Sequence, residues 1–302
     1  MKISRRNFLK TTALTSLYFA GFGAPAYTSQ TKKNLVIIML RGGMDGLCAI
    51  PIKGDNNFEK LRSKINLERT LKLTSDFDLH PALKTFKSLW DQNLSAAVHA
   101  TNIPYTGRSH FDGQNLMESG GKIPYQEKTG WLGRGMKVAG LTGQGLALAL
   151  PMPLLIRGVP MNNNYFPVGR SLPYPDTLEL IKQAYKEHDE KLLSDNLEII
   201  LNRDFNNRSR DDAWILASSA GTELSKPDGP KVAVFEVDGF DTHAAQGATD
   251  GAHADCLSDY DNIVRSLKSS MSEEAFNNTL VLTLTEFGRT IKQNSSNGTE
   301  HG

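Results

Sequence analysis

The chain has 302 residues, of which 39% are hydrophobic and 22% are charged. This length allows one large domain or two small ones, with enough chain for a substantial core. The formal net charge is +1, and basic residues do not gather with aromatic ones. We therefore expect neither nucleic acid nor an anionic membrane as a partner.

The first 26 residues are typical of an export signal. Residues 4–10 contain a twin-arginine pattern, residues 11–22 are weakly apolar, and small residues suited to cleavage follow at 24–26. A basic N-terminus before a membrane anchor is the alternative, but crossing a bilayer takes about 20 apolar residues. We expect the twin-arginine translocase to export the protein to the periplasm or the medium, without a stable membrane anchor.

Beyond the signal, strand-like and helix-like stretches alternate. This alternation is typical of an α/β domain whose mostly parallel central sheet lies between helices, and we assign residues 27–302 to it. Strands are predicted at 34–40, 95–99, 146–150, 154–156, 232–237 and 280–284. Helices are predicted at 81–90, 177–185, 192–201 and 257–271, with a glycine-rich loop region at 106–134. Residues 176–221 have helical spacing, many charges and no strand pattern, and so predict a helical insertion.

Acidic residues and a histidine directly follow three of the predicted strands. Asp45 follows the first strand, Asp241 and His243 follow the strand at 232–237, and Glu286 follows the strand at 280–284. Ligands of open α/β sheets bind at the carboxyl ends of strands, and carboxylate and imidazole groups are common metal ligands. The sequence therefore predicts a metal site formed by these residues, with His301 as a further ligand.

Each of these residues also has a simpler interpretation. Asp45 could bond its own backbone in a turn. His243 could be an exposed loop residue, and Glu286 could pair with Arg289 instead of a metal. His301 could be a polar residue without a role.

A short loop at 108–114 offers further reactive groups. Ser109 could act as a nucleophile if a metal lowers its pKa, and His110 could serve as a ligand or general acid. Arg108 could hold an anionic substrate. The alternative is structural, with Ser109 capping a helix and Asp112 supporting its first turn.

The remaining histidines and the two cysteines are not expected to be ligands. Cys48 and Cys256 lack Cys-x-x-Cys spacing, and two buried free thiols are more consistent with their number than a single disulfide. Histidines assigned to structure or surface are His80, His99, His188 and His253.

In this order, the motifs resemble those of the bacterial domain of unknown function 1501 family, related to the alkaline phosphatase/sulfatase superfamily. The resemblance extends from about residue 34 to the last residue. The matching segments are Leu-Arg-Gly-Gly-Met-Asp-Gly (40–46), Ser-His-Phe-Asp-Gly-Gln (109–114), Gly-Trp-Leu-Gly-Arg (130–134), Gly-Phe-Asp-Thr-His (239–243) with Gln246, Glu-Phe-Gly-Arg-Thr (286–290) and Gly-Thr-Glu-His-Gly (298–302).

The resemblance implies an alkaline phosphatase-like fold with one or two divalent metal ions, usually zinc, manganese or calcium. Asp241, His243 and His301 would form one metal site, Asp45 would contact the metals, and Glu286 would serve a second site. Phe287 stands where phosphatases usually have a histidine of that second site. The family pattern continues past residue 302, so the resemblance implies a chain that lacks its C-terminal part.

We therefore expect an exported metal-dependent hydrolase that acts on small phosphate or sulfate esters. A non-catalytic periplasmic binding or assembly protein with a structural metal is the alternative. An inactive truncated product is a second alternative.

Overall fold

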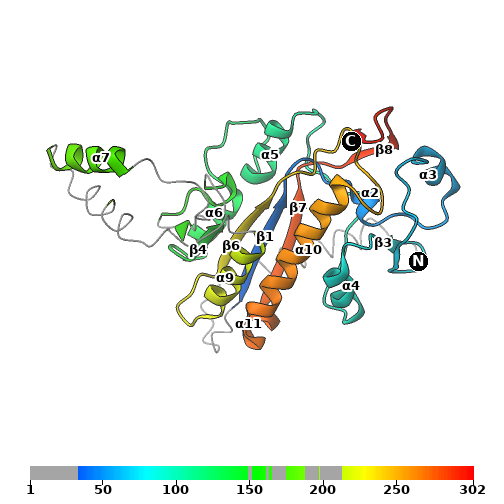
Figure 1. Cartoon of the computed structure of the whole chain (residues 1–302). Coiled ribbons are helices and arrows are strands. Elements are labelled where there is room, and N and C mark those ends of the chain that lie inside the picture. Colours follow the sequence, from blue (N-terminus) through cyan, green and yellow to red (C-terminus); the bar gives the residue numbers. More distant parts are fainter. Residues whose placement is uncertain (1–32, 149–151, 161–162, 165–174, 188–196, 198–212) are drawn as a thin grey trace.

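A computed structural model describes residues 33–148, 152–160, 163–164, 175–187, 197 and 213–302 of the chain. Its centre is a five-stranded sheet with the order β5-β4-β6-β1-β7, in which every pairing is parallel. The strands are β1 (Asn34–Leu40), β4 (Gly145–Leu148), β5 (Asn163–Asn164), β6 (Val232–Val237) and β7 (Thr279–Thr285). Helices flank this sheet, which confirms the α/β class (Figure 1).

The interior strand β1 has no solvent-facing side, and its sequence is almost entirely apolar for that reason. Val36, Ile38 and Leu40 face one hydrophobic cluster, whereas Ile37 and Met39 face the other. On the first side lie α4 (Lys84–Asp91), α9 (Ala213–Ser225) and α10 (Ala252–Ser270). On the second lie α5 (His110–Ser119), α6 (Trp131–Val138) and the 3-10 turn η1 (Leu154–Ile156).

The remaining elements are short helices and strands outside the central sheet. Two antiparallel hairpins join β2 to β3 and β8 to β9. The hairpin formed by β8 and β9 supplies one residue of the site described below. The bounds are α2 (Gly46–Ala49), α3 (Asn56–Leu61), β2 (Leu71–Lys72), β3 (Asp78–Leu79), α7 (Pro175–Glu187), α11 (Glu273–Asn277), β8 (Arg289–Gln293) and β9 (Thr299–His301).

Two of the predicted strands are wrong. Residues 95–99 form no strand, and Val98 is 73% exposed. The small side chains of this stretch bury little apolar area, which weakens the case for a strand. Residues 154–156 form η1, which begins just after Pro153, and proline cannot donate to a sheet ladder.

The prediction of a loop throughout 106–134 is also wrong, because α5 lies within this region and α6 begins in it. The glycines that suggested a loop permit close packing of helices instead. A Cβ atom at Gly133 would lie 2.1 Å from the carbonyl oxygen of Arg157, and one at Gly113 would lie 3.2 Å from the ring of Phe287. The helix predicted at 81–90 is present as α4, but it begins at Lys84.

Several predictions fall partly or wholly outside the described residues. These are the export signal, the helix at 192–201, His188 and most of the insertion at 176–221. The helix predicted at 177–185 is present within α7. Within the described part of the chain, no helix is both long and apolar enough to cross a membrane.

Candidate metal centre

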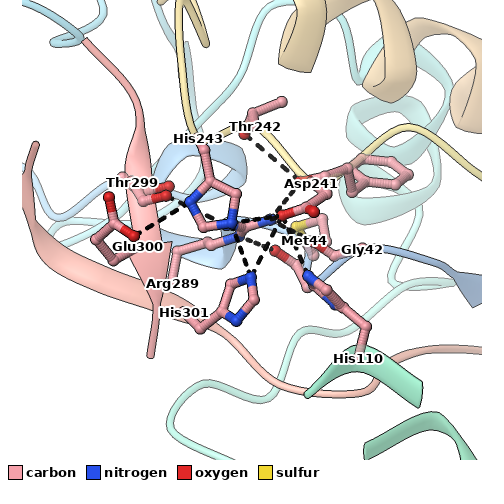
Figure 2. A network of polar contacts seen from close by, with 12 residues as sticks. Gly42, Met44, His110, Asp241, Thr242, His243, Arg289, Thr299, Glu300 and His301 are labelled. Atoms are coloured by element: carbon pink, nitrogen blue, oxygen red, sulfur yellow. Dashed lines mark hydrogen bonds and ion pairs between the residues drawn. The ribbon is translucent and has the colours of Figure 1, made fainter. Parts of the chain in front are cut away.

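Four side chains from three separate segments converge beyond the carboxyl ends of the strands. They are His110 at the start of α5, Asp241 and His243 in the loop after β6, and His301 in β9. One ligand atom from each residue lies within 4.8 Å of every other. Figure 2 shows the imidazole rings and the carboxylate directed at one another. We call these four residues the histidine–aspartate cluster.

Glycines allow neighbouring loops to pack closely against the segment that carries Asp241 and His243. Gly42, in the loop after β1, packs against the backbone of Asp241, where a Cβ atom would come within 2.5 Å of the amide nitrogen. Gly298 packs in the same way against His243, where a Cβ atom would lie 2.4 Å from the carbonyl. Any larger residue at these positions would displace a residue of the cluster.

The cluster is centred on one oxygen atom of Asp241. The Nε2 atoms of His243, His110 and His301 lie 3.0, 3.1 and 3.4 Å from Oδ1 of Asp241. The Nε2 atoms of His243 and His301 are 2.8 Å apart. Four ligands around a tetrahedral zinc ion, at about 2.0–2.1 Å each, would lie roughly 3.3 Å from one another. Four of the six separations between these ligand atoms are therefore close to those of a zinc site.

Each of the three imidazoles has an oxygen acceptor at its other ring nitrogen. Nδ1 of His110 lies 2.8 Å from Oε1 of Glu286, and Nδ1 of His301 lies 2.6 Å from the carbonyl oxygen of Arg108. Nδ1 of His243 lies 3.2 Å from Oε2 of Glu300.

These acceptors favour the tautomer that carries its hydrogen on Nδ1, which leaves the Nε2 lone pairs directed into the cluster. Histidines that bind metals are held in this way by outer oxygen atoms. Nε2 of His110 is buried and has no hydrogen-bond partner among the described residues. The residues present therefore fit a divalent metal ion that prefers nitrogen ligands.

A buried arginine adjoins the cluster. The side chain of Arg289 has 0% exposure, and its Nη2 atom donates to Oδ1 of Asp241 at 2.5 Å. Burial by itself would raise the pKa of Asp241, but the hydrogen bond from Arg289 and the nearby charges lower it to about 2. The carboxylate is consequently ionised at neutral pH, as a metal ligand must be. Burial lowers the pKa of His301, which favours the neutral ring.

Glu286 lies beside the cluster and is fully buried. Its Oε1 atom accepts hydrogen bonds from the backbone of Gly42, from Gln114 and from His110. Burial opposes its ionisation, but these hydrogen bonds lower its pKa. In this structure the residue predicted as a second-site ligand is the outer partner of His110.

Asp45 is not brought into the cluster. It pairs with the buried Arg62 through two hydrogen bonds of 2.6 and 3.0 Å, and Gln246 donates to it at 2.7 Å. It also caps α2 by accepting from the backbone of Cys48. Burial would raise its pKa, but the charge of Arg62 lowers it.

Ser109 caps α5, as the simpler interpretation held. Its Oγ atom accepts a hydrogen bond from the backbone of Asp112 at 3.3 Å. The neighbouring Arg108 is exposed, and its carbonyl holds His301. Thus the loop at 108–110 contributes one residue to the cluster and orients another.

Sequence reasoning missed three residues around the centre. Arg62 and Glu300 gave no signal because neither stands at a strand end. His253 was predicted at the surface but has 0% exposure, and it packs edge-on against Phe240. Its position at the second residue of α10 suggested exposure, but Phe240 and Gln246 of the loop after β6 contact His253 there.

The other histidines and the cysteines are largely as expected. His80 is buried and accepts from the backbone of Ala82, so it fixes the chain before α4. His99 stacks on Phe77. Both cysteines are free; Cys48 is buried, but Cys256 is partly exposed.

The fold and the cluster define an α/β protein with a candidate metal centre at the ends of its parallel strands. Residues 224–302 match the model of the family described as "Protein of unknown function (DUF1501)". This match includes Asp241, His243, Glu286 and His301, and excludes the segments that carry Asp45 and His110. No curated protein and no solved structure matches the chain. The likeness of residues 34–223 to this family, and its link to the phosphatase superfamily, stay predictions.

Proposed function

We propose that this protein binds one zinc ion in the histidine–aspartate cluster and uses it to hydrolyse small phosphate or sulfate esters after export. The observation that carries the proposal is the arrangement of three Nε2 lone pairs around one carboxylate oxygen, with every Nδ1 atom directed at an outer oxygen.

Zinc is favoured over the other two ions that the family resemblance suggests. Three imidazoles and one carboxylate suit zinc, whereas calcium and manganese prefer oxygen ligands. Among the residues that the structure describes, one group of this kind is found. This supports a single metal ion.

Hydrolysis is supported by the accessibility of the cluster. The side chains of Asp241 and His243 are 45% and 39% exposed, so solvent and a small substrate can reach them. When bound, a zinc ion acts as a Lewis acid that polarises an ester oxygen and makes a coordinated hydroxyl more acidic.

The loop before α5 supplies the remaining groups. Arg108 is exposed, and its guanidinium has no partner in the described part of the chain, so it is free to bind an anionic ester. Ser109 is assigned as the nucleophile. Its oxygen accepts the capping hydrogen bond, which leaves its own hydrogen free for transfer.

A second function is favoured by one observation. The cluster offers four protein ligands, and a zinc ion with four protein ligands is typical of structural sites. The rival proposal is therefore a non-catalytic periplasmic binding or assembly protein that its metal stabilises.

Metal content and turnover measured on the same samples separate the two functions. The purified protein is loaded with zinc and assayed against aryl phosphate and aryl sulfate esters. We expect about one zinc per chain, turnover of at least one ester, and loss of both in Asp241→Ala. Zinc retention with no turnover of any ester, and a melting temperature that falls on chelation, would favour the structural function. Absence of zinc would reject both.

A test of Ser109 as the nucleophile requires a variant that keeps the helix cap. Ser109→Asn retains a capping oxygen, whereas Ser109→Ala loses it at a cost of about 1 kcal/mol. We expect both variants to retain zinc and lose turnover. Turnover that survives in Ser109→Asn would show that Ser109 is not the nucleophile.

A further inference from the structure

Arg289 reaches the histidine–aspartate cluster from a position that its backbone contacts fix. Its Nε atom donates to the carbonyl of Gly43 at 2.7 Å, and its Nη atoms donate to the carbonyls of Gly42, Phe240 and Thr299 at 2.5, 3.1 and 3.2 Å. These carbonyls belong to the loops after β1 and β6 and to β9. The guanidinium therefore joins three segments of the chain and is held without help from Asp241.

From this position the guanidinium faces two residues of the cluster. Nη2 donates to Oδ1 of Asp241, the oxygen that the three imidazoles also approach. Nη1 lies 3.5 Å from Nε2 of His243. Figure 2 shows Arg289 between these side chains. A fixed positive charge thus lies where the ligand atoms meet.

A metal ion in the cluster and the guanidinium would share Oδ1 of Asp241. Two cations around one oxygen repel each other, and the repulsion is strong because Arg289 is buried away from solvent. In the absence of metal, the same guanidinium neutralises the carboxylate and hydrogen-bonds it. It therefore stabilises the assembled cluster when no ion is bound.

We propose that Arg289 is a resident cation that holds the cluster assembled without metal and competes with the metal ion for Asp241, so that bound metal is readily exchanged. This inference rests on the proposed metal binding and adds a regulation of affinity to it. Arg289 is a positioning residue here, since it acts on the metal through Asp241.

Calorimetric titration with Zn²⁺ tests the competition in the full chain. Arg289→Gln removes the charge and keeps a donor for part of the carbonyl contacts, and Arg289→Lys keeps the charge. We expect Arg289→Gln to bind Zn²⁺ at least about tenfold more tightly than the wild type, although its metal-free form melts at a lower temperature. Arg289→Lys should bind with nearly the wild-type dissociation constant.

The outcomes separate the two proposals. A folded Arg289→Gln that binds Zn²⁺ no more tightly than a zinc-binding wild type would overturn the competition and leave the metal site in place. Binding by Arg289→Gln alone would overturn the zinc site of the native protein and support the competition. No binding by either protein would overturn both.

A measurement on the wild type covers the case in which Arg289→Gln does not fold. With ¹⁵N-labelled arginine, we expect the Nη signals of Arg289 to shift on addition of Zn²⁺, because the contact with Asp241 weakens. The Nε signal, held by Gly43, should stay in place. Nη signals unchanged at saturating zinc would overturn the competition.

Discussion

The Nε2 atoms of His243 and His301 face each other at 2.8 Å across 58 positions of sequence. Both rings have an oxygen acceptor at Nδ1, so neither has a hydrogen to offer at Nε2 in its favoured tautomer. Two facing lone pairs repel unless a metal ion or a shared proton lies between them. This pair of residues is therefore a direct reason to test the cluster for a metal ion.

Replacing His301 with alanine removes one of four ligands. We expect the affinity for zinc to fall by more than about 100-fold, beyond the 10–100-fold that loss of an outer partner costs. Calorimetric titration of the variant with Zn²⁺ checks this. His99→Ala is the matched control, because His99 stacks on Phe77 away from the cluster and its loss should leave zinc affinity unchanged.

Glu286→Gln tests the support of His110. The substitution removes the charge of a buried acceptor, and we expect zinc affinity to fall by about 10–100-fold. Glu300→Gln is the comparison. Glu300 contacts His243 but is 52% exposed, so its substitution should lower zinc affinity less than Glu286→Gln does. Equal losses in the two variants would contradict the greater role of the buried acceptor.

Asp45→Asn tests whether Asp45 serves structure or metal. The change leaves Arg62 as a buried charge without its partner, which costs on the order of 3 kcal/mol of unfolding free energy. Urea denaturation measures this loss, and Asp55→Asn, a cap exchange at the start of α3, should change little. Zinc affinity should persist in Asp45→Asn; its loss with unchanged stability would make Asp45 a ligand.

The lowered pKa of His253 predicts how the free energy of unfolding of the metal-free protein changes with acid. Burial, as the dominant cause, lowers its pKa from 6.5 to about 4, against the charge of Asp45. Between these pH values the unfolded chain binds a proton that the folded protein does not, so the free energy of unfolding falls as the pH drops from about 6.5 to about 4. A pKa difference of this size corresponds to about 3 kcal/mol.

Denaturation of the wild type and His253→Leu in chelator, from pH 7 to pH 4, checks this response. Within the described part of the chain, neither ring nitrogen of His253 has a hydrogen-bond partner, so leucine removes no polar contact. The variant should lose less stability on acidification than the wild type. Parallel pH profiles would show that His253 does not set the response.

The main strands could be predicted because their apolar composition suits a sheet that is covered by helices on both faces. β1 and β6 are almost continuous apolar runs, as a sheet covered on both faces requires, and β7 reads similarly although it is more exposed. The strand-end rule then gave Asp241 and His243 correctly as neighbours in space. It says nothing of which loop folds over them, and that is why the sequence left His110 as either a ligand or a general acid.

The roles of Asp45 and Glu286 needed three-dimensional information. Each stands at a strand end beside the centre, but each meets a closer partner. Arg62 directly follows α3, far from any strand end, and reaches Asp45 while also bonding the carbonyls of Thr290 and Ile291. The spacing of residues along the sequence does not indicate such a contact.

The three acceptors behind the imidazoles differ in how firmly they hold their rings. Glu286 is sealed inside the protein, and the carbonyl of Arg108 belongs to the main chain, whereas Glu300 stands largely in solvent. His243 is therefore the imidazole that swings aside at least cost. In the proposed metal site, an ion would enter and leave past this ring, with His110 and His301 held in place by their acceptors.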